Sequence, residues 1–209
     1  MRGYLHTMPT HQSTEVRRQE IVDCARKIIA TRGAQGLTIS ELARAVGISD
    51  GAIYRHFRSK QEVLLALIDD IEETLFQRIE KAKQEGATPL DQLENVLQEH
   101  LSYVERRLGV SFLVIGEVLA NGDRQLRQRM QAVVERYLKT VEEILREGAA
   151  QGQVNPAINF DAAALALFGL VQATVTLWHF AKTELPPTQR HQSLWQVYQE
   201  GIVLRKCST

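Results

Sequence analysis

The feature that most constrains the fold of this chain is the segment TISELARAVGISDGAIYRHFRSK, which starts at Thr38. Thr38 followed by Glu41 has the spacing of a capping box, so a helix is predicted to begin there. Gly47 is predicted to end that helix, because glycine adopts the left-handed conformation that often follows a helix C-terminus. Ser49 and Asp50 both have side chains suited to cap a second helix. The segment therefore predicts two short helices joined by a tight turn.

The second of these helices carries the chemistry of the segment. Gly51 and Ala52 are small, so the start of the helix can approach a base edge closely, while Ile53 and Phe57 are expected to face inward. The outer side is then aromatic and basic, with Tyr54, Arg55, His56, Arg58 and Lys60. This is the pattern of a helix-turn-helix whose second helix enters the DNA major groove. The alternative is an ordinary two-helix corner of an all-α protein. That alternative does not explain why caps, small residues and cations occur together here.

The stretch LTISELARAVGISDGAIYRHFRSKQEVLLAL resembles the DNA-binding signature of TetR-type transcriptional regulators. The likeness covers about Arg17 to Ile71 and rests on the Ala-Val-Gly-Ile-Ser turn together with Gly51, Tyr54, His56, Phe57 and Lys60. TetR-type proteins are usually homodimers that block a promoter until a small molecule releases them. The resemblance therefore implies a homodimeric regulator, a near-palindromic double-stranded DNA operator and a small-molecule effector.

Carried over position by position, the resemblance also implies which residues contact DNA. These are Thr38, Ser40, Asp50, Gly51, Ala52, Tyr54, Arg55, His56 and Lys60. Thr38 and Ser40 would touch phosphate or an adjacent base edge, and Tyr54, His56 and Lys60 would hold phosphates. Arg55 would read a guanine with both guanidinium nitrogens or bind a phosphate. Asp50 departs from the pattern because an acid repels phosphate, so it is expected either to read a cytosine amino group or to act as a cap.

Charge is distributed unevenly along the chain. The 25 Lys and Arg residues balance the 25 Asp and Glu residues. Residues 1–60 contain ten Lys and Arg and five acids, a net charge of +5, which leaves −5 for residues 61–209. A basic end on an acidic body suits a polyanionic partner. The alternative is that the surplus arginines form an ordinary solvated surface.

The remaining sequence is helical in pattern, with no strand candidate, and 209 residues suffice to bury a core. The predicted fold is all-α with about nine helices: an N-terminal three-helix helix-turn-helix domain and a larger C-terminal helical ligand-binding and dimerisation domain. The first domain is expected at 14–60, extending into a connecting helix at 60–85, and the second at 61–209. Residues 1–13 are expected to form a loose arm, and Thr14 to cap the first helix. Besides the two helices above, helices are expected at about 14–32, 60–85, 89–107, 111–120, 123–151, 161–183 and 188–204.

The helix at 161–183 is apolar on nearly all sides, so it is predicted to be buried on more than one face. One face can pack in its own subunit and another against a partner. With the aromatic stripe of the last helix, this predicts a two-fold dimer built as a four-helix seam. The alternative is a monomer whose core uses both faces. The residues expected at the interface are Leu170, Thr174, Leu177, Trp178, Leu194, Trp195, Tyr198 and Ile202.

An effector pocket is predicted among four helices of the C-terminal region. Its expected lining is mostly apolar, and each lining residue taken singly is more often core than ligand contact. The residues are Tyr103, Phe112, Ile115, Leu119, Met130, Val134, Tyr137, Phe168, Gln172, Val175 and His179. Tyr103, Tyr137, Gln172 and His179 would supply the few polar groups. The sequence therefore predicts an apolar or amphipathic ligand.

Other classes of protein find less support. The sequence has no nucleophile elbow, HExxH motif or phosphate-binding glycine loop, and no Cys/His cluster with metal spacing, so neither an enzyme nor a cofactor or metal site is expected. Cys24 is expected to be a small buried side chain, and Cys24 and Cys207 cannot form a disulfide framework. The N-terminus lacks the apolar region of a secretory signal, and the apolar run 162–170 is too short to span a bilayer. A bacterial cytoplasmic, nucleoid-associated protein is expected.

Two functions fit this combination. The first is a ligand-responsive repressor, although the sequence does not separate repressor from activator. The second is a DNA-bound adaptor, because AIYRHFRSKQEVLLALIDDIEETLFQRI is similar to nucleoid-occlusion division inhibitors of the TetR type. A sensor requires a closed cavity, whereas an adaptor requires an exposed partner surface.

Overall fold

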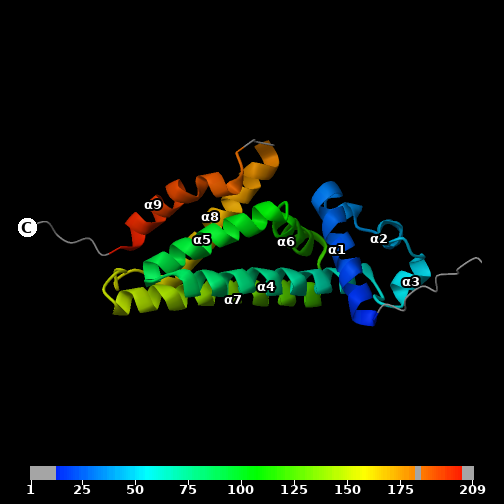
Figure 1. The fold of residues 1–209 in the computed structure, drawn as a ribbon, viewed down its shortest axis with the longest axis horizontal. Helices are drawn as coiled ribbons and strands as arrows, with labels where there is room; N and C mark the ends of the chain where they lie inside the picture. Colours follow the sequence, from blue (N-terminus) through cyan, green and yellow to red (C-terminus); the bar gives the residue numbers. More distant parts are fainter. Residues whose placement is uncertain (1–12, 182–184, 204–209) are drawn as a thin grey trace, which may run out of the picture.

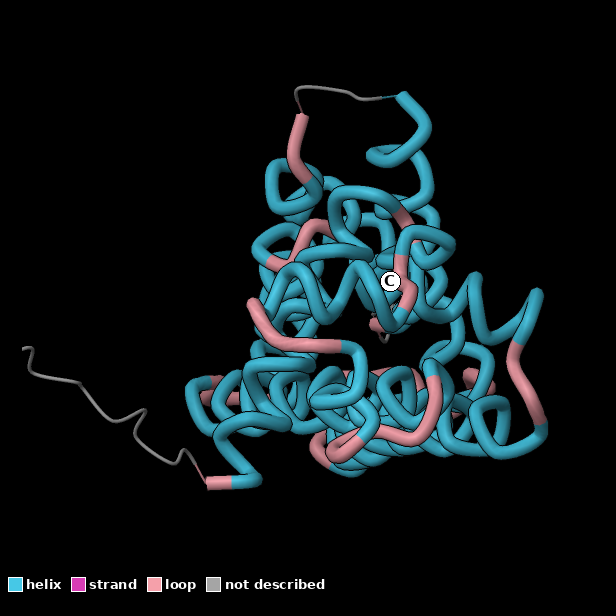
Figure 2. Tube along the Cα trace, turned by 90° about the vertical axis from the view of Figure 1, so that its right-hand side faces the viewer, coloured by secondary structure: helices cyan, strands magenta, loops and turns pink. Residues whose placement is uncertain are grey.

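The computed structural model describes residues 13–181 and 185–203, and within these ranges the chain is helical with no strand (Figures 1 and 2). The all-α fold predicted from the sequence is confirmed. The described elements are α1 (Thr14–Arg32), η1 (Ala34–Gly36), α2 (Ile39–Val46), α3 (Asp50–Tyr54), α4 (Lys60–Glu85), α5 (Pro89–Arg106), α6 (Val110–Asn121), α7 (Arg124–Ala150), α8 (Phe160–Ala181), η2 (Pro187–Arg190) and α9 (His191–Ile202). The only β-type pairing in the described part is an isolated bridge between Val154 and Val203.

Side-chain caps fix most helix starts. The Thr38 hydroxyl accepts a hydrogen bond from the Glu41 backbone N–H at 3.1 Å, as its spacing predicted. Thr88 and Asp91 form a reciprocal capping box ahead of Pro89 at the start of α5. Ser13 rather than Thr14 caps α1, so Thr14 is the first residue of that helix. Each cap satisfies backbone N–H groups that have no partner within the helix.

The helices form two regions along the long axis of the molecule (Figure 1). Helices α1–α3 gather at one end, which we call the head, and α4 runs from the head along α7, with α5 beside it, in the region we call the body. The inner side of α4 packs into a core that runs from head to body, with Leu64, Leu67, Ile68, Ile71, Leu75 and Ile79 all buried. One continuous core thus connects the two ends of the molecule.

Ion pairs fasten α4 to the body as well. The half-buried Arg107 at the end of α5 pairs with Asp70 and donates to the Thr74 hydroxyl at 2.9 Å. On the other side, Arg129 and Arg136 of α7 both pair with Glu72, the latter at 3.0 Å. Pairs of this kind on partly buried side chains restrict α4 more than isolated surface pairs do.

Two helix boundaries add to or differ from the sequence-based expectations. The recognition helix α3 is short and ends at Tyr54, after which a turn carries Phe57 into the core. The expected helix start at Thr188 falls in the 3-10 helix η2, and α9 begins at His191. Some expectations fall outside the described residues. These are the N-terminal arm, the helix ends at 183 and 204, and Cys207.

Helix α8 is longer than its uninterrupted apolar run suggested. Its 22 residues are long and apolar enough to cross a membrane by length and composition alone, which corrects the expectation based on residues 162–170. Core helices of soluble proteins pass the same test. Only 28% of its most apolar 18-residue window is buried within this chain, so much of α8 is uncovered in a single copy.

Candidate DNA-binding surface and effector site

The two helices of the helix-turn-helix are joined by side chains as well as by the turn. Gly47 ends α2 with φ +79°, the left-handed conformation predicted for it. The Ser49 hydroxyl accepts from the Ala52 N–H at 3.2 Å and so caps α3. Asp50 therefore is not the cap: its carboxylate accepts a hydrogen bond of 2.6 Å from the hydroxyl of Ser40 on α2. This bond fixes α3 against the start of α2.

The outer side of α3 is free for contact. Ile53 and Phe57 are completely buried, as expected, whereas Tyr54 is 53% exposed and Arg55 is exposed. A Cβ on Gly51 would meet only the Ser49 hydroxyl, at 4.0 Å, so the backbone there is open to close approach. The structure thus brings Gly51, Tyr54 and Arg55 together on an accessible face of the head.

His56 is half-buried, and a residue that the sequence analysis missed holds its backbone. The Arg18 side chain of α1 donates to the His56 carbonyl, and its guanidinium lies over the Phe57 ring, 4.1 Å from the centroid. Arg18 thereby joins α1 to the end of the recognition segment. Nothing in the local pattern distinguishes this arginine from its neighbour Arg17, which pairs with Glu20 instead.

Lys60 is directed toward the body rather than held free at the DNA-facing side. Its ammonium donates to the Ala34 carbonyl at 3.1 Å and to the Glu117 carboxylate of α6 at 3.0 Å. Glu117 is buried, and its other oxygen accepts from the amides of Gln35 and Asn121 at 3.2 and 3.3 Å. These groups form a polar junction between head and body, beside a hollow of about 290 Å³. The phosphate contact implied for Lys60 thus competes with an existing ion pair.

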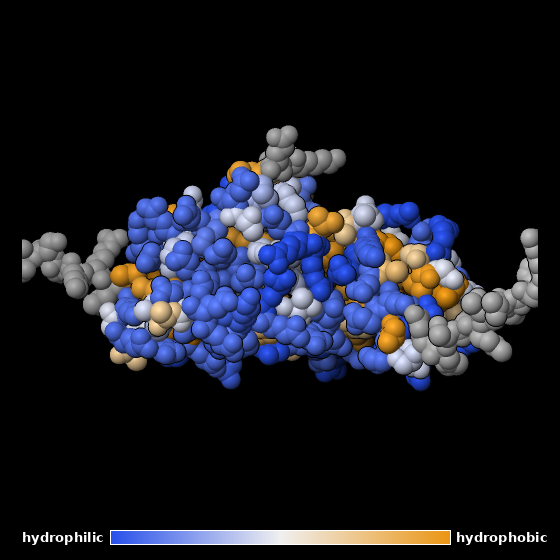
Figure 3. Space-filling view, viewed as in Figure 1, coloured by the Kyte–Doolittle hydropathy of each residue, from blue (hydrophilic) through white to orange (hydrophobic). Residues whose placement is uncertain are grey.

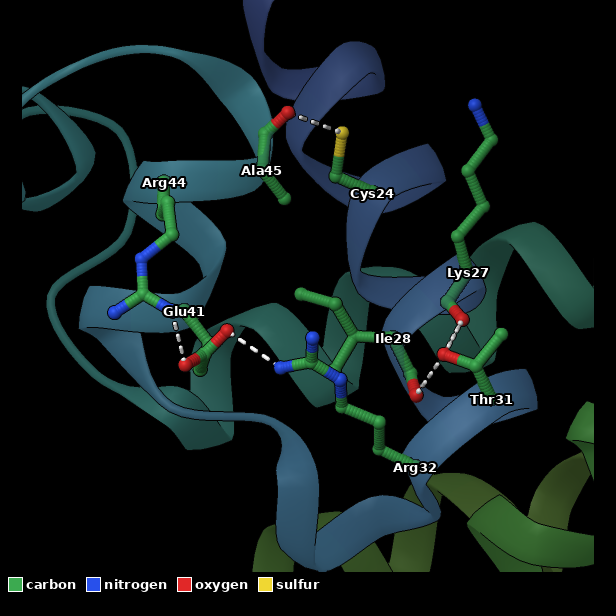
Figure 4. A pocket seen from close by; sticks show the side chains of 8 residues that line it. All are labelled: Cys24, Lys27, Ile28, Thr31, Arg32, Glu41, Arg44 and Ala45. Atoms are coloured by element: carbon green, nitrogen blue, oxygen red, sulfur yellow. Dashed lines mark hydrogen bonds and ion pairs between the residues drawn. The ribbon is translucent and has the colours of Figure 1, made fainter.

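A groove of about 320 Å³ between α1 and α2 adds positive charge to the side of the head (Figure 4). Arg32 and Arg44 both pair with Glu41, at 2.7 and 2.6 Å, and Lys27 extends away from them. Cys24 lines this groove and is half-buried, so the expectation of a buried side chain is wrong. Its thiol lies 3.8 Å from the Ala45 carbonyl.

The expected effector pocket is only partly assembled. The tilted rings of Tyr137 and Phe168 lie 5.5 Å apart between centroids, and those of Phe112 and His179 lie 5.8 Å apart. A buried histidine that the sequence analysis missed, His100 of α5, lies 4.9 Å from the Tyr137 ring. Local sequence gave no signal for it, because its neighbours in space come from α7 and α8.

Other members of the predicted pocket lie apart. Leu119 is 70% exposed, so its expected place in a pocket lining is wrong, because that side of α6 faces solvent. The hydroxyl of Tyr103 is directed at the Ile71 carbonyl, 3.5 Å away, on the side of α4. The hollows at the side of the head, beside the polar junction and along α9 are lined by none of the eleven predicted residues.

The predicted dimer interface divides into two groups. Thr174 of α8 is buried within its own chain, and so are Trp195, Tyr198 and Ile202, because α9 packs its aromatic stripe against the body. The other four are half-buried or exposed: Leu170, Leu177, Trp178 and Leu194. The uncovered side of α8 consists of exposed residues spaced three or four positions apart. The sequence analysis did not distinguish them from the residues on the core side of the same helix. Its exposed members are Ala162, Leu165, Ala166, Gly169, Ala173, Leu177 and Phe180, and we call them the outer face of α8.

This outer face is a large apolar surface. Leu165, Leu177 and Phe180 are 54%, 56% and 82% exposed, and Val197 of α9 is 70% exposed beside it. An apolar hollow of about 400 Å³ lies between α8 and α9, lined by Ala166, Leu170 and Val197 among others. The surface over α4 and α5 is by contrast largely hydrophilic (Figure 3). Extended apolar surface of this kind marks an interaction site.

Comparison with known proteins identifies the class. Residues 21–67 match the family model "Bacterial regulatory proteins, tetR family", and residues 65–199 match "YsiA-like protein, C-terminal region". The protein is therefore a DNA-binding regulator with a helix-turn-helix head. The chain belongs to the TetR family, and the resemblance seen in its sequence is confirmed.

Curated relatives and solved structures agree with this assignment. The chain is 31% identical over 189 residues to the nucleoid occlusion factor SlmA of Idiomarina loihiensis, covering 90% of this chain and 95% of the relative. SlmA of Shewanella halifaxensis is 32% identical over 194 residues, with the same coverage.

Among solved structures, FadR of Bacillus subtilis in complex with stearoyl-CoA has 26% identity and a TM-score of 0.78, covering 88% of this chain and 98% of that one. A TetR regulator from Chloroflexus aurantiacus has 26% identity and a TM-score of 0.80, covering 92% and 98%. These relatives are regulators or DNA-binding factors and not enzymes.

Proposed function

We propose that the protein is a homodimeric repressor that leaves its operator when a small, largely apolar ligand binds the body. The observation that carries this proposal is the combination of an exposed Tyr54 and Arg55 on a basic head with an uncovered apolar face of α8 in the body. A two-fold dimer through α8 would present two heads to a near-palindromic operator, one in each of two successive major grooves. The proposed domains are 14–60 for DNA binding and 61–209 for regulation and dimerisation.

The proposed DNA-contacting residues follow from exposure. Gly51, Ala52, Tyr54 and Arg55 would meet the duplex, with Thr38, Ser40, Asp50 and His56 supporting or flanking them. Lys60 is proposed as a junction residue, because its ammonium already pairs with buried Glu117. We assign the protein no cofactor and no catalytic role, and we place it in the bacterial cytoplasm on the nucleoid.

The route from ligand to DNA is proposed to pass through α6 and α4. Glu117 of α6 contacts Lys60, the first residue of α4, and Gln35 of η1, so a shift of α6 moves two groups at the base of the head. A ligand can release DNA in this way only through unequal affinity for the two arrangements. The stearoyl-CoA bound by the similar FadR structure favours a long-chain acyl compound.

A second candidate is a DNA-bound adaptor that recruits a protein partner. The observation that favours it is 31–32% identity over 90% of the chain to nucleoid occlusion factors. An adaptor would keep its DNA when acyl compounds are added, whereas a repressor would release it.

One experiment separates the two. Genomic fragments bound by the purified chain would be selected, and stearoyl-CoA would be titrated into the complex while fluorescence anisotropy of the labelled DNA is followed. Release at micromolar stearoyl-CoA supports the repressor. A complex that persists to saturating ligand contradicts ligand control and favours the adaptor. Failure to select any fragment at low salt would contradict both.

Arg55→Ala is expected to separate phosphate binding from base reading. If Arg55 binds phosphate, affinity falls for all sequences and the slope of log K against log salt decreases by about one. If Arg55 reads a guanine, operator affinity falls by about 1–3 kcal/mol while non-specific binding is unchanged. The measurement is DNA affinity across a salt series for operator and random duplexes.

Lys60→Ala serves as the matched comparison. Because Lys60 is already paired with Glu117, we expect the salt slope of DNA binding to stay unchanged and the thermal stability to fall. A decrease of the slope by about one in this variant would instead restore Lys60 to the set of phosphate contacts.

A further inference from the structure

Two polar side chains inside the body have buried atoms without a hydrogen-bond partner. They are the Nδ1 atom of His100 on α5 and the hydroxyl of Tyr137 on α7. His100 is 4% exposed and Tyr137 is 1% exposed, and their ring centroids lie 4.9 Å apart. Phe168 of α8 closes the group, 5.5 Å from Tyr137 and 6.4 Å from His100. Folded proteins rarely leave such groups unpaired, so a missing partner is indicated.

The other buried tyrosines of the described body differ from Tyr137 in this respect. The hydroxyl of Tyr103 reaches the Ile71 carbonyl at 3.5 Å, and the hydroxyl of Tyr198 donates to the Ala163 carbonyl at 3.0 Å. The unpaired hydroxyl is therefore specific to Tyr137, at the place where α5, α7 and α8 meet, and is not a general feature of the tyrosines in this body.

Both groups of the pair are uncharged near neutral pH. Burial lowers the pKa of His100 to about 4, because desolvation disfavours the imidazolium. Burial, with a smaller contribution from Tyr198, raises the pKa of Tyr137 well above its usual 10. Neutral imidazole and phenol groups in an apolar site donate hydrogen bonds to an uncharged partner. A carboxylate would have to lose its hydration there without gaining an opposite charge from either group.

We propose that His100 and Tyr137 are the polar recognition pair of the effector site, and that the effector presents to them an uncharged carbonyl or hydroxyl group on an apolar chain. This inference rests on the ligand-responsive function proposed above and names the chemical class of its ligand. An ester, a thioester or an alcohol of a long chain fits the pair, whereas the free carboxylate of the same chain does not.

The test compares two probes that share a chain and differ in charge. Methyl dodecanoate and dodecanoate are titrated into the full-length protein at pH 8, where the acid is ionised, and binding is followed by tryptophan fluorescence. We expect the ester to bind at least tenfold more tightly than the carboxylate. Equal affinity of the two probes for the wild-type protein would overturn the inference.

The variant Tyr137→Phe removes the hydroxyl and keeps the ring. We expect it to reduce the ester-to-carboxylate affinity ratio at least fivefold without lowering the melting temperature of the ligand-free protein, because the lost hydroxyl has no partner there. Tyr103→Phe is the matched control, and it should lower the melting temperature while leaving the affinity ratio unchanged. These two readouts separate recognition of ligand from a structural role.

A melting temperature of Tyr137→Phe that falls as far as that of Tyr103→Phe, with no change in probe selectivity, would show an internal water as the partner and overturn the inference. If both probes release DNA with equal potency, only the inference fails. If DNA binding is normal but neither probe binds, the ligand-responsive function fails together with it.

Discussion

Leu177→Glu is expected to convert the protein into a monomer of 23.6 kDa and to abolish operator binding. Leu177 is 56% exposed in the single chain and lies on the outer face of α8 between Ala173 and Phe180. A carboxylate at the centre of an apolar interface would be buried without a partner, and such a group costs several kcal/mol. The monomer itself should fold, because the substituted side chain lies outside its own core.

Loss of the dimer has a large effect on DNA because two linked heads bind as one bivalent unit. The second head binds at a high effective concentration, so separating the heads lowers apparent affinity by about 10²–10⁴-fold. Analytical ultracentrifugation measures the first effect and operator anisotropy the second. Leu119→Glu is the control: this leucine is 70% exposed on α6 and is not part of the outer face of α8, so its substitution should leave both measurements unchanged. A Leu177→Glu protein that remains dimeric would place the interface elsewhere.

The head could be predicted well because its signals are local. Thr38, Gly47 and Ser49 each act within four residues of their own position, through caps and a left-handed turn residue. The inward positions of Ile53 and Phe57 follow from the same spacing. Caps, turns and helical periodicity are encoded in neighbouring residues, so a single sequence reveals them.

The positions of Lys60 and Asp50 could not be predicted in the same way. Lys60 bonds Glu117, 57 residues further along the chain, and the Ser40–Asp50 bond joins two separate helices. Resemblance assigned both residues a DNA contact, but their charges already have partners in the protein. Side-chain pairing between distant elements depends on how the helices pack, and periodicity carries no information about it.

The outer face of α8 shows the same limit. When nearly every side of a helix is apolar, spacing does not reveal which side packs in its own chain. The sequence-based set therefore included Thr174, which is 4% exposed, and omitted Leu165 and Phe180, which are 54% and 82% exposed. Only the placement of α5, α7 and α9 around α8 separates the two sides.

Gly109→Ala is expected to destabilise the protein by about 3 kcal/mol, through two additive causes. Gly109 has φ +67°, a left-handed conformation that alanine adopts only with strain. A Cβ at this position would also lie 2.0 Å from Cε1 of His179, a contact that requires the ring or α8 to move. For a chain of this length the melting temperature should fall by about 10 °C, measured at fixed protein concentration.

Two further variants separate these causes. Gly116→Ala, inside the helix α6 that follows Gly109, has open space around its Cβ and no positive φ, so it should stabilise the protein by about 0.5–1 kcal/mol. In a His179→Ala background the steric cause is removed, and Gly109→Ala should then cost only about 1 kcal/mol, from backbone strain. An undiminished cost in that background would mean that the turn before α6, and not its contact with α8, sets the requirement for glycine. Helix α6 also carries Glu117, which pairs with Lys60. The contact of His179 with Gly109 therefore fixes the start of α6 against α8 and, through Glu117, the position of α6 relative to Lys60.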